Sequence, residues 1–239
     1  MRKPQKEIWK TLNDVFDIFT ERTIHSLITK GVIDGLESPL SIGKESNVFT
    51  AKKGNEKVAV KIYRLQTADF NKMYSYIKSD PRFLELRHQR RKIIFEWCKR
   101  EYKNLLIAIR GEVRVPHPKA FANNTLAMSL IGGEAPAPKL SVQKPKNPEE
   151  FYKKVLREMK KLYDAGLVHA DLSQFNILNY DENPVLIDLS HATTFKDPNA
   201  EEWLRRDCKN VANYFKKIGL NITEEEVHKE IVGNSKKND

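Results

Sequence analysis

The chain has 239 residues, a length that allows one domain or two closely packed lobes and suffices to bury a core. Hydrophobic residues make up 40% and charged residues 31%, and no apolar run approaches the roughly 20 residues of a spanning helix, which excludes a disordered chain and a membrane protein. The net charge of +10 favours a polyanionic partner such as a nucleotide or RNA, although a basic protein without such a partner has the same composition.

The N-terminus and the cysteines narrow the class of protein further. The opening decapeptide, MRKPQKEIWK, leads into an amphipathic stretch rather than an apolar signal segment, which predicts an intracellular, cytoplasmic protein. Two cysteines, Cys98 and Cys208, cannot form a disulfide framework or fill a four-ligand zinc site. The six histidines are scattered, so we expect no structural metal.

The N-terminal part of the chain is predicted to be helical and then β-stranded. Apolar residues between positions 7 and 28 recur in steps of three and four, which is typical of one or two amphipathic helices. Short β-type runs follow at 46–51 and 57–63, and Gly54-Asn55 is the predicted hairpin turn between them.

The remainder begins with a polar and basic segment at 65–90, for which we expect a mobile or partly helical insertion. The further predicted elements are, in chain order, a helix at 92–109, strands at 113–121 and 125–130, a Gly/Pro-rich hinge at 131–148, a helix at 148–162, strands at 177–180 and 185–188 around a turn at 181–184, and helix from 199 onward. This order, in which strands come first and a hinge and mostly helices follow, indicates an α+β chain. The predicted domains are an N-terminal helical segment at 1–36, an N-lobe at 37–131 and a C-lobe at 132–239.

The first candidate site is the turn SIGKESNV at 41–48, between two predicted strands. Gly43 and the small polar residues near it let backbone N–H groups approach phosphate oxygens. The kinase loop G-x-G-x-x-G-x-V has three glycines where this turn has one, so an ordinary hairpin turn stays open as an alternative.

The second candidate is Lys61, which ends the apolar run VAVK on the following strand. A lysine in this place can hold the α- and β-phosphates of ATP, whereas a surface lysine is the alternative interpretation. The ammonium needs an acidic partner on the next long helix, where Glu96 and Glu101 both lie. We choose Glu101, because the apolar pattern of the helix follows it directly.

The third candidate is the segment VHADLSQFN at 168–176. It resembles the kinase catalytic loop H-R-D-L-x-x-x-N, with Asp171 and Asn176 at the same spacing. Asp171 can accept a hydroxyl proton or orient a nucleophile, and Asn176 offers a neutral oxygen to Mg²⁺. His169 is expected to be packed and to fix the loop rather than to act as an acid or base.

The fourth candidate is Asp188, at the end of the apolar run VLID. An acidic residue in such a place is costly unless it meets a cation or hydrogen-bond donors, and Mg²⁺ bridging nucleotide phosphates would meet that need. An aspartate that only caps a turn is the alternative. The order of the four features favours a metal site, because H-x-D-x-x-x-x-N followed by a strand and a second buried-looking aspartate is uncommon by chance.

Taken together, these motifs resemble one family. SIGKESNVF is similar to the S-T-G-K-E-A-N-V-Y loop of RIO kinases of the first subfamily, LVHADLSQFNIL is similar to their catalytic-loop signature, and IDLS at 187–190 stands where ordinary kinases have D-F-G. The resemblance covers roughly residues 10–225 and is typical of an archaeal member. It implies an α+β, bilobal protein-kinase-like fold with a β-rich N-lobe, a helical C-lobe truncated after the metal-binding loop, and an added N-terminal helical segment.

The resemblance also implies roles for individual residues. Lys61 would contact the ATP phosphates, and Asp171 would be the catalytic aspartate. Asn176 and Asp188 would bind Mg²⁺, with Mn²⁺ as an alternative ion, and in this family the metal-binding aspartate is also assigned as the acceptor of an aspartyl-phosphate. The other predicted nucleotide-binding residues are Gly43, Lys44, Glu45, Ser46 and Val48 in the turn, Glu101 on the helix, and Met128, Ser129 and Ile131 around the adenine.

The implied function is an Mg²⁺-dependent ATP phosphotransferase, an autophosphorylating serine protein kinase, an ATPase, or both, in maturation of the small ribosomal subunit. Its expected partners are ATP, a precursor of that subunit with its RNA, and a protein serine substrate that the sequence does not identify. Too few residues follow Ser190 for an activation segment, an A-P-E anchor and a peptide-docking helical platform, so a conventional peptide groove is not expected.

Two other functions stay open. A nonenzymatic RNA- or ribosome-binding module with ATP as a conformational ligand is favoured by the charge of +10 and by the basic segment at 82–100. A small-molecule phosphotransferase would share the H-x-D-x-x-x-x-N loop and a later metal aspartate. The G-K-E-x-N turn and the Asp188-Leu189-Ser190 sequence favour the RIO type over this last alternative.

Overall fold

The computed structural model describes residues 17–66, 68–80, 82 and 89–233, and the chain divides into two compact units. The first unit comprises Met1–Met73, Arg87–Lys99 and Pro118–Leu130, and the second comprises Tyr74–Leu86, Arg100–His117 and Ile131–Asp239. The predicted helical residues before Asp17, residues 83–88 of the predicted insertion and the tail after Gly233 lie outside the described residues. The boundaries of the predicted domains stay a prediction.

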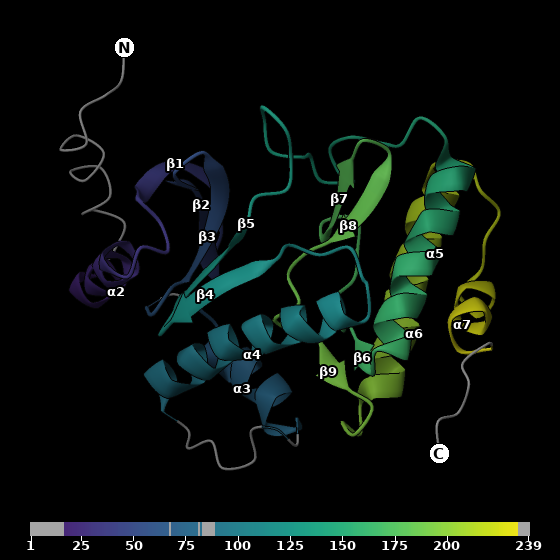
Figure 1. Cartoon of the computed structure of the whole chain (residues 1–239). Helices are drawn as coiled ribbons and strands as arrows, with labels where there is room; N and C mark the ends of the chain where they lie inside the picture. The colour runs from purple at the N-terminus through teal and green to yellow at the C-terminus, as the bar shows by residue number, and fades with distance from the viewer. Residues whose placement is uncertain (1–16, 67, 81, 83–88, 234–239) are drawn as a thin grey trace. The chain divides into compact units, whose positions relative to one another are not determined.

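The first unit is built on an antiparallel five-stranded sheet in the order β1-β2-β3-β5-β4 (Figure 1). Its strands are β1 (Gly35–Ile42), β2 (Ser46–Lys53), β3 (Glu56–Tyr63), β4 (Pro118–Ala122) and β5 (Thr125–Ser129). Lys53 pairs with Glu56, so the two-residue turn predicted at Gly54-Asn55 is confirmed, and Gly54 supplies the positive φ of 56° that such a turn favours.

The two faces of this sheet carry different residues because side chains alternate along a strand. Phe49, Val60 and their neighbours on one face form a buried core with Ile24 and Leu27 of helix α2 (Ile18–Thr29). The Asp17 carboxylate caps that helix by accepting hydrogen bonds from the N–H groups of the first turn. The helix therefore covers one face and leaves Lys61 of β3 on the other.

The second unit is mainly helical, with two short strand pairs (Figure 1). Its helices are α5 (Pro148–Asp164), α6 (Ala200–Lys217) and α7 (Glu224–Val232), and its strand pairs are β6 (Leu167–Val168) with β9 (Thr193–Thr194) and β7 (Ile177–Tyr180) with β8 (Asn183–Leu186). Helices α5, α6 and α7 pack on one another through buried apolar side chains such as Val155, Phe215 and Ile231. The sheet of the first unit and the helices of the second confirm the predicted α+β class.

The structure differs from the sequence predictions in three places. The tight turn of the β7–β8 hairpin is Asp181-Glu182, with φ of 49° and 56°, so Asn183 and Pro184 belong to β8 rather than to the predicted turn. No strand forms at 113–117, and β4 begins at Pro118. The pair β6–β9 was not predicted, because two-residue strands carry no periodic signal.

The predicted insertion at 65–90 contains helix α3 (Phe70–Lys78), in agreement with the partly helical alternative. Helix α4 (Arg90–Arg110) follows it and confirms the helix predicted at 92–109. Among the residues that the structure describes, no helix combines the length and the apolar character needed to cross a bilayer.

Candidate functional site

The predicted phosphate-binding turn connects β1 and β2 in the first unit. Gly43 N–H donates to the Ser46 carbonyl at 3.0 Å, and a Cβ at position 43 would lie only 3.0 Å from that same oxygen. Arg64 fixes the turn from the end of β3, since its N–H donates to Glu45 O at 2.9 Å and its Nη1 to Gly43 O at 3.3 Å. The single glycine therefore stands where the turn is tightest, and the turn is held by the strand that carries Lys61.

Lys61 lies in the middle of the sheet, paired with Val48 on β2 and with Leu126 on β5. Its side chain is 4% exposed, and Nζ lies 5.0 Å from the centre of the Tyr63 ring. Alternation places Lys61, Val48 and Met128 on the face of the sheet opposite α2. The structure thus excludes the surface-lysine alternative for Lys61.

Other predicted nucleotide residues are distributed over both units. Met128 and Ser129 are the last residues of β5 in the first unit, while Ile131 and Glu101 belong to the second. Glu101 is 1% exposed on α4, whereas Glu96 is paired with Lys99 at 3.1 Å. Because Lys61 and Glu101 belong to different units, the ion pair between them stays a prediction.

The catalytic-loop motif folds into a tight loop in the second unit. The nitrogen side of the Asn176 amide faces Asp171, because Nδ2 donates to Asp171 O at 2.9 Å and to Asp171 Oδ2 at 3.1 Å. This arrangement turns Oδ1 of Asn176 away from Asp171. The spacing that the sequence shares with kinase loops therefore produces a direct contact between the two side chains.

His169 is buried and holds the same loop. Its Nε2–H donates to the Ile187 carbonyl at 3.1 Å, one residue before Asp188. Burial lowers the pKa of His169, so the ring is neutral at physiological pH, and its Nδ1 has no hydrogen-bond partner among the described residues. This geometry agrees with the prediction that His169 fixes the loop.

Asp207 on α6 holds the loop that contains Asp171, a role that the sequence analysis did not predict. Its Oδ2 accepts a hydrogen bond from Ala170 N–H at 2.8 Å, and its Oδ1 accepts one from Leu172 N–H at 2.7 Å. The carboxylate therefore binds the backbone on both sides of Asp171. The neighbouring Arg206 donates to the Ala170 carbonyl. Asp207 lies in the buried stripe Trp203-Asp207-Val211, and an acidic residue within such a stripe was the available sequence signal.

Burial raises the pKa of Asp207 to about 7, although the N–H donors of Leu172 and Ala170 oppose the rise. A native pKa above the unfolded value of about 4 means that the folded chain binds the extra proton between pH 4 and 7. We therefore expect the free energy of unfolding to fall as the pH rises through this window, by up to about 1.4 kcal/mol per pH unit from this group.

This pH dependence is measured by denaturant unfolding from pH 4.5 to 8 in the wild type and in Asp207→Asn. The variant should lose this contribution to the slope, because its side chain does not titrate. Equal slopes in both proteins would contradict the assignment of the titration to Asp207. In Asp207→Ala, the two buried N–H groups lose their acceptor, which should cost about 3 kcal/mol or more of stability.

Asp188 follows the β7–β8 pair directly. Ile177 pairs with Leu186, and Ile187 N–H donates to Asn176 O at 3.0 Å, so the backbones of Asn176 and of the residue before Asp188 are neighbours. Asp188 has a φ of 62°, which a non-glycine residue adopts at a cost of about 1 kcal/mol or more. Its Oδ1 accepts from Ser190 Oγ at 2.7 Å.

The oxygen atoms of Asn176 and Asp188 are suitable ligands for a hard cation. An amide oxygen from Asn176 and a carboxylate from Asp188 are the kind of ligand that Mg²⁺ prefers, and a magnesium ion bound chiefly through nucleotide phosphates uses one or two protein ligands. Among the described residues, no group of three or more His, Cys, Asp or Glu side chains is arranged to hold a metal ion. The residues therefore fit a nucleotide-borne Mg²⁺ better than a metal held by the protein alone.

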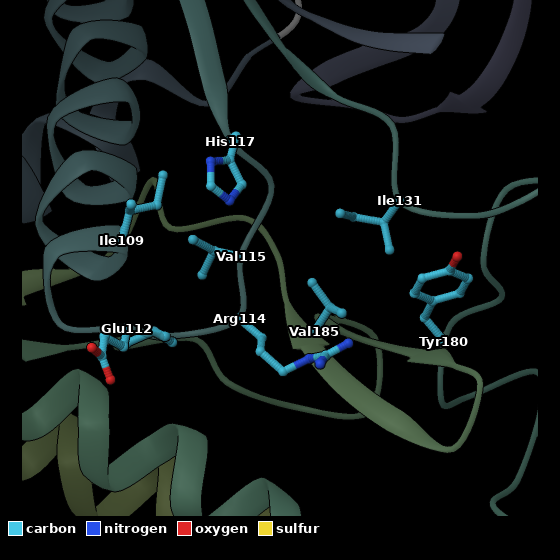
Figure 2. Close-up of a pocket in the computed structure, with 9 residues that line it drawn as sticks. Ile109, Glu112, Arg114, Val115, His117, Ile131, Tyr180 and Val185 are labelled. Atoms are coloured by element: carbon cyan, nitrogen blue, oxygen red, sulfur yellow. The ribbon is translucent and has the colours of Figure 1, made fainter. Parts of the chain in front are cut away.

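A pocket of about 360 Å³ lies elsewhere in the second unit (Figure 2). It is lined by Ile109, Glu112, Val113, Arg114, Val115, His117, Ile131, Tyr180 and Val185. Figure 2 shows the aliphatic side chains around the hollow and the Arg114 side chain below Val185. Of the predicted site residues it includes Ile131 only, and none of Asp171, Asn176 and Asp188 lines it.

Comparison with known proteins identifies the family of this chain. The family model of the RIO1 type, described as the RIO domain, matches residues 47–228. The RIO-type serine/threonine-protein kinase Rio1 of Haloferax volcanii is 41% identical over 235 residues, which cover 98% of this chain and 81% of that protein. Its namesake from Methanocaldococcus jannaschii is 38% identical, over 94% of this chain and 78% of that protein.

The fold has solved counterparts. The crystal structure of the Rio2 kinase-ADP/Mg²⁺-phosphoaspartate complex from Chaetomium thermophilum superposes with a TM-score of 0.69 at 22% identity, over 89% of this chain and 66% of that one. This likeness confirms the protein-kinase-like fold. With the matching family model and the two archaeal relatives, it follows that the chain belongs to the RIO1 family of RIO-type serine/threonine-protein kinases.

Proposed function

We propose that the chain transfers the γ-phosphoryl group of ATP with the help of Mg²⁺. The observation that carries this proposal is the contact of Asn176 with Asp171 on one side and the backbone pairing of Asn176 beside Asp188 on the other. Asn176 and Asp188 would hold the ion, which when bound neutralises charge on the phosphate oxygens. Lys61 and the turn at Gly43 would bind the phosphates.

In transfer to a serine, Asp171 accepts the hydroxyl proton as the serine oxygen attacks the γ-phosphorus. The bond between that phosphorus and the β,γ-bridging oxygen breaks, and ADP leaves with the electron pair. Asn176 keeps the Asp171 carboxylate in place through the Nδ2 contact of 3.1 Å. His169 is neutral and buried, so it supports the loop and takes no part in moving the proton.

The proposal includes an aspartyl-phosphate on Asp188. One carboxylate oxygen would attack the γ-phosphorus, ADP would leave, and water would later hydrolyse the acyl phosphate. The support is the backbone contact of Ile187, the residue before Asp188, with Asn176 and the phosphoaspartate complex of the Rio2 kinase from Chaetomium thermophilum. Ser190 Oγ, 2.7 Å from Oδ1, would hold the carboxylate so that its other oxygen faces the nucleotide.

The test is a single-turnover reaction of the purified chain with γ-labelled ATP. We expect label on the protein, or released as phosphate, with Mg²⁺ or Mn²⁺ present and none when a chelator removes the divalent ion. Binding of ATP without any transfer or hydrolysis under either metal would instead favour a nonenzymatic module in which ATP is a conformational ligand.

We further propose that the partner is a precursor of the small ribosomal subunit and its RNA, which the net charge of +10 supports. Binding through phosphates releases counterions, so the affinity for RNA should fall by about tenfold or more between 50 and 200 mM salt. A filter-binding titration of a structured RNA at several salt concentrations measures this. An affinity that does not change with salt would contradict binding through phosphates.

A further inference from the structure

A buried polar cluster in the second unit holds the segment that follows Asp188. It consists of Asp80, Arg82, Arg100 and Asn104, which come from the end of the predicted insertion and from α4. Three of the four side chains are fully buried, and Arg82 is 21% exposed. None of the four belongs to the predicted nucleotide or metal site, so the proposed reaction does not yet explain them.

Asn104 is the member that reaches the loop. Its Nδ2 donates to the Leu189 carbonyl at 2.8 Å and to the Ala192 carbonyl at 2.7 Å. Ala192 N–H in turn donates to Leu189 O at 3.2 Å, so both bonds of Asn104 hold one tight turn. The turn begins at Leu189, the residue that follows Asp188 in the chain. Asn104 therefore holds the backbone directly after the proposed metal ligand.

The rest of the cluster fixes the orientation of Asn104. Arg82 Nη1 donates to Asn104 Oδ1 at 2.8 Å, which directs the amide nitrogen to the two carbonyls. The Asp80 carboxylate holds the Arg82 guanidinium group by accepting hydrogen bonds from its Nε at 2.9 Å and its Nη2 at 2.6 Å. Arg100 Nε lies 3.2 Å from the same carboxylate, so two cations balance the buried Asp80.

The Asp188 backbone needs such support. Its φ of 62° is unfavourable for a residue with a Cβ and persists only when the surroundings determine it. His169 holds the preceding residue through Ile187 O, and Asn104 holds the following residue through Leu189 O. The carboxylate therefore stands between two buried side chains that fix the backbone on either side.

We propose that Asn104, oriented by Arg82, is a positioning residue that sets the metal affinity of Asp188. The inference rests on the proposed role of Asp188 in holding the nucleotide's Mg²⁺. Asn104 does not touch the ion or the nucleotide in this account, and it acts by keeping the left-handed backbone and the turn at Leu189 in one conformation. Asp80 and Arg82, near the end of the insertion, are thereby coupled to the proposed metal site.

The test uses Asn104→Asp, which keeps the shape of the side chain and the bond from Arg82 but removes the amide donor to both carbonyls. The matched control is Asn179→Asp, a buried asparagine of β7 whose Nδ2 donates to Glu182 Oε1 at 3.2 Å, away from the loop. Two quantities are measured for each protein: the affinity of its ADP complex for Mn²⁺ by electron paramagnetic resonance, and its affinity for ADP in the presence of chelator.

We expect Asn104→Asp to weaken Mn²⁺ binding about tenfold while ADP binding without metal stays within about twofold of the wild type, and we expect the control to keep both affinities. Amide hydrogen exchange at Leu189–Ala192 should also become faster in Asn104→Asp only. Should that variant not fold, Arg82→Gln, which loosens the orientation of Asn104, is expected to weaken Mn²⁺ binding by about threefold to fivefold.

Unchanged Mn²⁺ affinity in the folded variant, or an equal loss in the Asn179 control, would overturn the positioning role while leaving the proposed function intact. A wild-type ADP complex that binds no Mn²⁺ would instead remove the proposed function, and the positioning role with it.

Discussion

Replacing Asp171 with Asn should lower the rate of γ-phosphoryl transfer by about 10³-fold and leave the affinity for ATP within about twofold of the wild type. The reason is that Asn cannot accept the hydroxyl proton, although it has the shape of the lost side chain. The Asn176 contact to the Asp171 backbone carbonyl, at 2.9 Å, does not depend on the carboxylate and should keep the loop in place. Single-turnover kinetics and a nucleotide titration measure the two quantities.

The matched control is Asp181→Asn, an exposed aspartate at a φ of 49° in the β7–β8 turn, where Asn is well tolerated. It should transfer phosphate at the wild-type rate. A rate in Asp171→Asn within tenfold of the wild type would show that another group accepts the proton, and it would remove Asp171 from the proposed mechanism.

The second large effect is expected in Asp188→Asn, which removes both the proposed anionic metal ligand and the proposed phosphate acceptor. After a single turnover with γ-labelled ATP and an acid quench, the wild type should carry label that hydroxylamine releases, as an acyl phosphate requires. The variant should carry no hydroxylamine-labile label. Phosphoserine is stable to hydroxylamine, so label from autophosphorylation on serine is distinguished in the same experiment.

Asp164→Asn is the control for Asp188, because Asp164 is an exposed aspartate of the same unit whose carboxylate pairs with Lys160 at 3.1 Å. This control should form the labile label as the wild type does. Hydroxylamine-labile label at the wild-type level in Asp188→Asn would place the acyl phosphate on another carboxylate.

The sequence alone predicted the parts of the site whose spacing is local. Asp171 and Asn176 lie five residues apart within one loop, and in the structure the Asn176 amide contacts the Asp171 carboxylate. The continuous apolar run VAVK placed Lys61 at the end of a predicted strand but left a surface lysine open, and the 4% exposure of Lys61 in the structure decides between the two. The family resemblance added the roles of these residues, which no periodicity contains.

Residues that act across long sequence separations could not be predicted in the same way. Asp207 meets Ala170 and Leu172 only because α6 packs against the catalytic loop, and Asn104 meets Leu189 only because α4 passes the loop after Asp188. Each of these side chains was visible in the sequence as a polar residue on a buried helical face. Its partner depends on tertiary packing, which the pattern of a single helix does not specify.

The most direct test of the central claim, that Asn176 and Asp188 together hold the divalent ion of the nucleotide, is a Mn²⁺ titration of the ADP complex. The wild type, Asn176→Ala and Asp188→Asn are compared with and without ADP. We predict one tight Mn²⁺ site in the wild type that requires ADP, weakened at least tenfold in each variant. Wild-type affinity for Mn²⁺ in both variants would contradict this account of the site.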